Sequence, residues 1–174
     1  YIKRNPLTLY RRQRRGGKGA RGMETRDEDF VEHLGLASTH AFLLFFTNRG
    51  RIYWLKVHEL PKLGRAARGK AIVNVLSLRD GERVQTMLPV RSFEGIEGES
   101  ILLATRRGVV KKTPLAAFSN PRRSGIIAIN LAEDDELIGV GRTSAHNEVI
   151  LASKGGKSIR FDESQVRAMG RSAT

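Results

Sequence analysis

Short apolar runs separated by glycine-containing polar turns recur along the chain and predict β-hairpins. Three runs enter such turns, each with a glycine where the backbone needs a positive φ: residues 42–46 before Gly50, 101–104 before Gly108 and 149–152 before Gly156. A second extended segment leaves each turn. This arrangement is typical of antiparallel strands joined by short connections.

A longer pattern follows each of the first two hairpins and indicates an internal repeat. A basic loop comes first, then a β-branched segment that favours a third strand, then an acidic turn and a fourth strand. In the first repeat these parts are residues 61–70, 71–78, 79–82 and 83–90. In the second they are residues 119–125, 126–131, 133–136 and 137–141.

The two ends of the chain fit the same register. Residues 1–37 read as the back half of a repeat, with residues 27–29 as the acidic turn, 30–37 as the fourth strand and no third strand. Residues 149–174 read as the front half of another, so residues 1–174 form one domain with whole repeats at 42–90 and 101–141. We therefore predict an all-β, propeller-like β-pinwheel of about three four-stranded antiparallel blades. The blade interiors are expected to hold Leu43, Phe45, Ile101, Leu103 and Ile150.

Charge adds a functional direction to this fold. The chain carries 31 Lys and Arg against 18 Asp and Glu, a net charge of +13, and basic residues are densest before residue 27. The run Gln13–Gly19 combines arginines, a lysine and glycines, which suits close approach to a polyanion, and we expect a long, exposed, mobile loop there. The predicted DNA-contacting residues lie in the basic loop of each repeat: Arg11, Arg12, Gln13, Arg14, Arg15, Gly16, Gly17, Lys18, Gly19, Arg21, Arg65, Arg68, Lys70, Arg122 and Arg123.

Other chemistry finds little support in the sequence. No cysteine is present, the four histidines have no ligand spacing, and no nucleophile with an adjacent base can be assembled. The stretches 17–22 and 155–158 resemble nucleotide-binding loops but lack the flanking strand and helix, or the first glycine. The longest apolar run, residues 41–46, is too short to span a bilayer, so we expect a cytoplasmic protein. Because Tyr1 is not an initiator methionine, we expect a segment of something longer.

The sequence of residues 13–19 closely resembles the basic box of the DNA gyrase A C-terminal domain family. Residues 67–74, 108–113, 135–140 and 166–170 also resemble that family. The resemblance implies a six-bladed β-pinwheel, about half of it present here, that wraps duplex DNA around its rim and so enables negative supercoiling. It implies as partners double-stranded DNA, the rest of the gyrase A protein, and the gyrase B protein in a heterotetramer. The catalytic tyrosine, magnesium and ATP would belong to other parts of the enzyme, which leaves this chain non-catalytic and without a cofactor.

Two alternatives stay open at this stage. The equivalent domain of topoisomerase IV is the nearer one, and the intact box argues against it because that paralogue typically lacks the box or carries a degenerate one. A propeller used for protein contacts would need an apolar or aromatic hot spot on a disc face, and Trp54 is the only tryptophan.

Overall fold

The computed structural model describes residues 1–173 and confirms an all-β chain. The strands are β1 (Phe42–Thr47), β2 (Arg51–Lys56), β3 (Val84–Val90), β4 (Ser100–Thr105), β5 (Val110–Pro114), β6 (Ile126–Ile127), β7 (Leu137–Thr143), β8 (Glu148–Ala152) and β9 (Ser158–Asp162). Short 3₁₀ turns are η1 (Leu7–Leu9), η2 (Val57–Glu59), η3 (Ile72–Asn74), η4 (Leu115–Phe118) and η5 (Glu163–Gln165).

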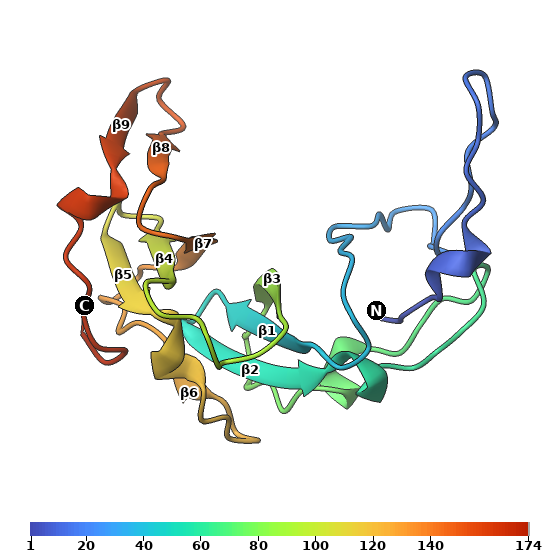
Figure 1. The fold of residues 1–174 in the computed structure, drawn as a ribbon, viewed down its shortest axis with the longest axis horizontal. Helices are drawn as coiled ribbons and strands as arrows, with labels where there is room; N and C mark the ends of the chain where they lie inside the picture. The colour runs from blue at the N-terminus through green and yellow to red at the C-terminus, as the bar shows by residue number, and fades with distance from the viewer. Residues whose placement is uncertain (174) are drawn as a thin grey trace.

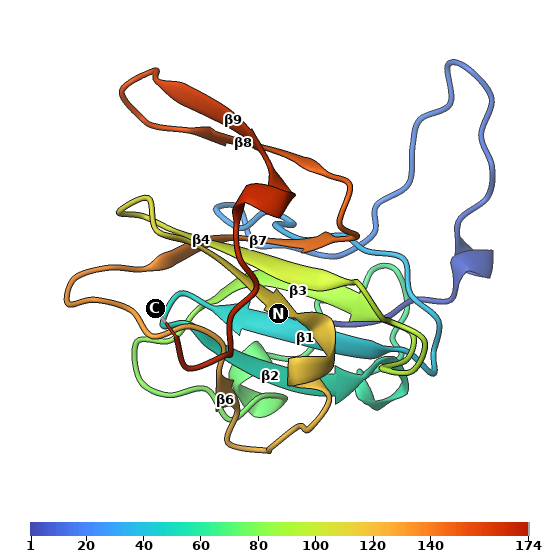
Figure 2. The ribbon, with the colours of Figure 1, turned by 60° about the vertical axis from the view of Figure 1, so that its left-hand side comes forward.

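The strands form three antiparallel sheets that follow one another along an open arc (Figure 1). The sheet orders are β3-β1-β2-β6, β5-β4-β7 and β8-β9. A long loop before β1 projects from one end of the arc, and the β8–β9 hairpin projects from the other. Figure 2 shows the first two sheets lying against each other as layers. The first sheet has the predicted four strands and β8–β9 forms the predicted front half of a repeat, whereas the second sheet has three strands instead of four.

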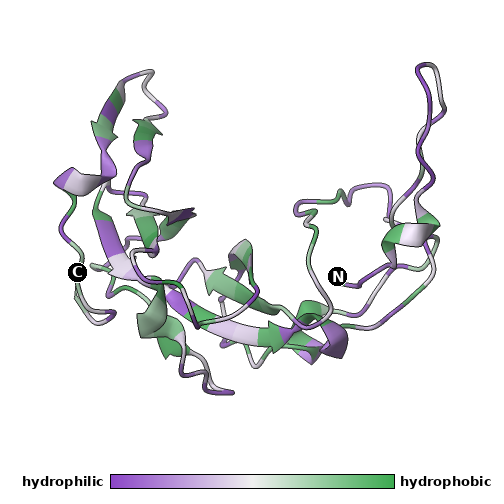
Figure 3. Cartoon of the chain, in the orientation of Figure 1, coloured by the Kyte–Doolittle hydropathy of each residue, from purple (hydrophilic) through white to green (hydrophobic). Residues whose placement is uncertain are grey.

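The sheet β3-β1-β2-β6 is covered on both faces at β1, which explains the nearly continuous apolar run in this strand. Leu44 and Phe46 point into the core shared with the β4 sheet, while Leu43 and Phe45 pack on the opposite side. Most of β1 is accordingly coloured hydrophobic in Figure 3. Alternation between apolar and polar positions disappears when both faces of a strand are covered.

The strand β6 pairs with the sheet of the preceding repeat, not with its own. Ile126 is opposite Ile52 of β2, and Ile127 is opposite Arg51. A similar connection joins the half repeat of residues 1–37 to the repeat of residues 42–90, where Ile2 forms a β-bridge with Lys70. Neighbouring repeats are therefore joined by backbone hydrogen bonds.

Three predicted segments depart from regular strands. Residues 71–78 form the 3₁₀ turn η3 instead, because Asn74, Val75 and Leu76 donate their N–H groups to carbonyls three or four residues back, and this buries Leu76 against the core. The strand expected over residues 126–131 ends after Ile127. Residues 30–37 are irregular and largely exposed, since no strand of residues 1–173 pairs with them.

The interior positions were mostly predicted correctly. Leu43, Phe45, Ile101 and Leu103 are all at most 4% exposed. Ile150 is 67% exposed, so its prediction is wrong. It lies on β8, which pairs only with β9 within the described residues, so its side chain has no second layer to cover it.

The turn glycines take the predicted left-handed backbone. Gly50, Gly108 and Gly156 have φ of 69°, 87° and 79°. Gly50 is also packed against the chain, because a Cβ atom there would lie 2.5 Å from the Ile129 carbonyl oxygen. The carbonyl of Gly50 accepts the N–H groups of both Ala128 and Ile129, which ends the β6 ladder.

Candidate nucleic-acid interface

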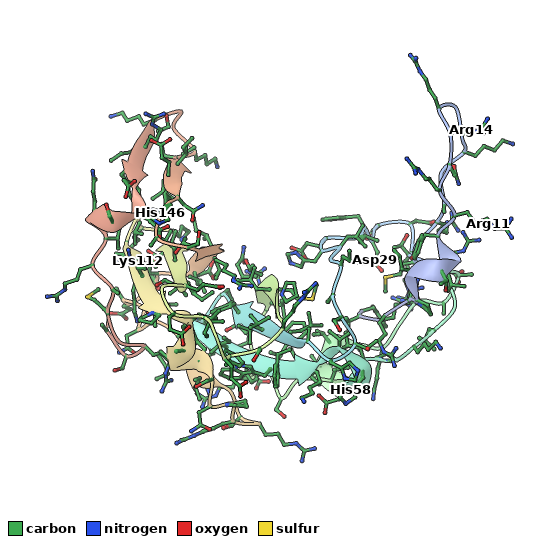
Figure 4. All side chains as sticks on the ribbon, viewed as in Figure 1. Arg11, Arg14, Asp29, His58, Lys112 and His146 are labelled. Carbon is green, nitrogen blue, oxygen red and sulfur yellow. The ribbon has the colours of Figure 1, made fainter. Side chains whose placement is uncertain are left out.

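The basic box forms the tip of the long loop that projects from the arc. Every residue from Leu7 to Arg21 is exposed, and Figure 4 shows Arg11 and Arg14 reaching outward from this loop. No salt bridge involves the side chains of Arg14, Arg15 or Lys18 within residues 1–173. These three cations are therefore available to a ligand from solution.

A glutamine closes the base of this loop. Gln13 Nε2 donates a hydrogen bond to the Gly19 carbonyl at 3.0 Å, and the Gly19 N–H donates to Gln13 Oε1 at 2.8 Å. Inside the loop, the Gly17 N–H donates to the Arg14 carbonyl. A Cβ atom at Gly17 would lie 2.4 Å from Gln13 Oε1, so the clasp requires a glycine there. The predicted loop thus has an internal scaffold, and Gln13 serves it with both ends of its amide.

Some of the predicted contact residues are brought together across the repeat junction. Arg11, Gln13 and Arg65 line one shallow hollow together with Thr8, Leu9 and Ala20. Arg12, Arg14 and Arg15 line a second hollow with Gln13. The box and the basic loop of the next repeat therefore present their cations to a shared surface.

Other predicted residues are differently placed. Arg68 is held within the protein: its guanidinium lies 3.9 Å from the Tyr1 ring centroid and 3.5 Å from the Asp29 carboxylate. Lys70 is exposed, although its backbone is bridged to Ile2. Arg21 is exposed near the end of the box loop.

Arg122 and Arg123 form a separate basic patch in the loop that leads into β6. Both are exposed, and a turn between the Gly125 N–H and the Arg122 carbonyl shapes their loop. A Cβ atom at Gly125 would lie 2.7 Å from the Tyr53 ring, which shows how closely this loop follows β2. Because β6 lies on the convex side of the arc in Figure 1, this patch belongs to the outer side of the molecule.

Three cations that the sequence did not single out donate hydrogen bonds to loop backbone from inside the protein. Lys3 and Lys111 each donate from Nζ to three backbone carbonyls, and Arg51 donates to the carbonyls of Ser124 and Gly125. Burial, with a contribution from Arg171, lowers the pKa of the Lys111 ammonium to about 8. The repeat alignment places Lys3 and Lys111 at matching positions. This match is the sequence signal that could have identified both lysines.

The acidic turns also have a role inside the protein. Glu82 is buried and accepts hydrogen bonds from the Tyr53 hydroxyl and the Arg79 N–H. Asp135, the corresponding residue of the next repeat, is 4% exposed and accepts the N–H groups of Arg107 and Glu136. These carboxylates bind turn backbone, so they do not form a free acidic surface.

Neither a metal site nor a membrane-spanning helix is found among residues 1–173. No group of three or more His, Cys, Asp or Glu side chains has a geometry that could hold a metal ion. No helix among them is long and apolar enough to cross a membrane.

Comparison with known proteins identifies the family. The family model described as "DNA gyrase C-terminal domain, beta-propeller" matches residues 1–38, 41–91, 99–144 and 147–174. The chain belongs to the DNA gyrase C-terminal domain family. Its relatives include the DNA gyrase A proteins of Salmonella typhimurium, 53% identical, and of Escherichia coli, 49% identical, both over all 174 residues. The chain spans only 20% of the length of either relative.

Solved structures show the same fold. The C-terminal domain of DNA topoisomerase IV superimposes with a TM-score of 0.83 at 31% identity, covering 100% of this chain and 52% of that one. A DNA gyrase A C-terminal domain gives a TM-score of 0.69 at 23% identity, covering 99% of this chain and 55% of that one. The chain thus shares its fold with the C-terminal domain of that topoisomerase IV.

Proposed function

We propose that this gyrase C-terminal domain binds duplex DNA without sequence preference and bends it. The bent duplex would wrap around the basic outer edge of the domain with a single handedness. The observation that carries the proposal is the exposed, internally clasped box loop, whose cations share a surface with Arg65 of the next repeat. Exposed arginines and lysines on irregular loops suit phosphate oxygens, and no α-helix within residues 1–173 is available to enter a groove.

Wrapping, as distinct from binding, follows from the spacing of the basic loops along a curved body. The box loop and the Arg122–Arg123 loop belong to different repeats of an arc (Figure 1). A duplex that contacts both must follow the curvature between them. Bending DNA by about 40 to 90 degrees over a short site costs roughly 1 to 6 kcal/mol, so several phosphate contacts are needed to hold it.

Membership of the gyrase family suggests the enzyme in which this domain would act. The chain would act with the rest of the gyrase A protein and with the gyrase B protein in a heterotetramer in the cytoplasm, where trapping a DNA crossing of one hand leads to negative supercoils. Strand cleavage, magnesium and ATP would be supplied by those other parts. This domain would contribute DNA geometry without a cofactor of its own.

The topoisomerase IV assignment is less well supported than the gyrase assignment. The gyrase assignment is preferred because the matched relatives are DNA gyrase A proteins, up to 53% identical, and because the box is intact, although the topoisomerase IV domain superimposes with a higher TM-score (0.83) than the gyrase A domain (0.69). A protein-contact propeller built on Trp54 is also disfavoured, because Trp54 is partly buried against the core between the first two sheets.

The deciding experiment reads DNA topology directly. Nicked plasmid is ligated in the presence of the protein, and the sign of the trapped writhe is measured after the protein is removed. A consistent shift of one sign supports wrapping, and an unchanged topoisomer distribution contradicts it. Binding should also weaken steeply with salt. The logarithm of the binding constant should fall with the logarithm of the salt concentration with a slope of about −5, for on the order of 6 contacted phosphates.

A further inference from the structure

At three repeat junctions, a cation of one repeat donates hydrogen bonds to backbone carbonyls in the loop that follows the hairpin of the next repeat. Lys3 Nζ donates to the carbonyls of Gly64 and Arg65 at 2.8 Å and of Ala67 at 2.6 Å. At the last junction, Lys111 Nζ donates to the carbonyls of Arg171 and Ala173, which lie about sixty residues further along the chain, and to Ala128 of its own repeat. Each ammonium thus uses three hydrogen bonds, which is its full donor capacity.

The middle junction achieves the same contact with a different pair of residues. Tyr53 lies opposite Phe45 in the β1–β2 ladder, as Lys111 lies opposite Leu103 in the β4–β5 ladder, so the two positions are equivalent. Tyr53 cannot supply an ammonium. Arg51, two residues earlier, instead donates from Nη2 to the carbonyls of Ser124 and Gly125 at 2.6 and 3.0 Å. Three junctions therefore share one contact made by two kinds of side chain.

The recipients are backbone carbonyls in loops that lack a regular hydrogen-bond ladder. Residues 64–67 and 171–173 lie outside any strand, so their carbonyls have few backbone donors to bond with. A cationic donor satisfies several such carbonyls at one point and makes stronger bonds than a neutral group would. Lys111 has no exposed surface, which places the charge beneath the loop and out of reach of a ligand.

These contacts also fix where the outward-facing cations stand. Lys3 holds the carbonyl of Arg65 itself, and the Arg65 side chain lines the hollow shared with the box. Arg51 holds the residues directly after Arg122 and Arg123. Loss of the internal cation would free the loop backbone and spread the exposed side chains over many positions.

We propose that Lys3, Arg51 and Lys111 are positioning residues: inter-repeat fasteners that hold each basic loop in the geometry needed to bend DNA. The fastening follows from the hydrogen bonds alone, whereas its consequence for DNA rests on the proposed wrapping function. None of the three residues needs to touch DNA for this role.

The test compares two lysine substitutions at the first junction. Lys3→Met removes the ammonium that holds residues 64–67, while Lys62→Met removes an exposed ammonium of the same loop whose side chain makes no hydrogen bond among the described residues. Both lower the net charge by one. Lys3→Arg keeps a cationic donor and serves as the conservative rescue. Lys3 lies at the edge of the fold, so circular dichroism of all three variants should match the unmodified chain.

Loop order is measured first, without DNA. Amide hydrogen exchange over residues 62–70 should accelerate by at least about tenfold in Lys3→Met, because losing even one of its three charge-assisted hydrogen bonds brings a change of that size, and should stay unchanged in Lys62→Met. Trypsin cleavage after Arg65 should accelerate in parallel, and Lys3→Arg should restore most of the protection. Equal protection in Lys3→Met and Lys62→Met would overturn the fastener.

DNA bending is measured second, by energy transfer between the ends of a duplex of about 30 base pairs, roughly 100 Å long, so that a bend brings the ends within range of energy transfer. Lys3→Met should reduce end-to-end transfer well below the Lys62→Met value at equal DNA occupancy. If the loop loosens while bending by the two variants stays equal, the positioning role is overturned. If the unmodified chain does not bend DNA at all, the wrapping function fails while the exchange result still decides the fastener.

Discussion

Replacing Arg14, Arg15 and Lys18 with alanine tests whether the box contacts phosphates. All three side chains are exposed and form no salt bridge within residues 1–173, so their removal should change stability by less than about 0.5 kcal/mol. If each neutralises one phosphate, the log-log salt slope should become shallower by up to about 2.7, which is about half of the slope expected for the whole domain. Affinity should fall modestly because the other basic loops remain.

The matched control removes three exposed cations of hairpin turns that are not among the predicted DNA-contacting residues. Arg49, Lys154 and Lys157 are exposed, so their replacement with alanine gives the same net charge as the box triple variant. Filter binding or fluorescence anisotropy across a salt series gives the two slopes. If both triple variants shift the slope equally, DNA responds to net charge alone and the box has no special role.

The same box variant should separate wrapping from strand passage in a gyrase that carries this chain. The last contacts that close a bent duplex are the most easily lost, because the bend stores elastic energy that they must hold. Negative supercoiling should therefore be abolished, while relaxation without ATP and decatenation persist. Supercoiling at the unmodified rate would refute the view that the box closes the wrap.

Three further predictions concern the fold. Gly50→Ala should destabilise the chain by about 1 to 3 kcal/mol or more in a denaturant titration, because it combines a φ of 69° with a Cβ 2.5 Å from the Ile129 carbonyl oxygen; an unchanged midpoint would contradict the turn geometry. Phe118→Ala, at a side chain with no exposure, should cost about 3 to 5 kcal/mol, whereas Ile150→Ala should stay within about 0.5 kcal/mol; similar losses would contradict the assigned burial. Burial raises the pKa of Asp135, but hydrogen bonds from a side-chain hydroxyl and two backbone N–H groups outweigh it and hold that pKa below its ordinary value. Its stabilisation is therefore present above the unfolded-state pKa of about 3.8 and is lost as pH falls through the lower folded value, so the stability gap to Asp135→Asn should close in acid and a pH-independent gap would refute this.

The hairpins and two of the three predicted fourth strands could be predicted from the sequence because their signals are local. Apolar runs and turn glycines locate β1, β4 and β8, and the acidic turns locate the starts of β3 and β7. The partner of β6 could not be predicted this way, since no periodicity within residues 126–131 says which sheet supplies the ladder. Residues 71–78 failed for a related reason: burial of Leu76 through a turn overrode the β-branched preference of the segment.

In the candidate site, too, local features could be predicted from the sequence and features that depend on the fold could not. An exposed, glycine-rich, basic loop can be predicted from composition, and the structure places residues 7–21 in solvent as expected. The Gln13–Gly19 clasp depends on backbone conformation, and the pairing of Arg68 with Asp29 and Tyr1 depends on chain contacts that composition does not encode. A list of basic residues therefore mixes cations that face solvent with cations that hold the protein together.

The pairing of β6 with the preceding repeat ties the Arg122–Arg123 loop to the core. The chain leaves β5 through η4, whose Phe118 packs edge-on against Phe46 of the preceding sheet, and then forms the Arg122–Arg123 loop before β6 joins β2. The basic loop is thus attached at both ends to packing between the two sheets. Its direction must follow the angle at which those sheets stack, because the core on one side and the β2 ladder on the other leave it little independent freedom. The position of this basic loop is therefore set by buried side chains of the core, and a repeat excised at its sequence boundaries would lose the outer strand that the next repeat supplies to its sheet.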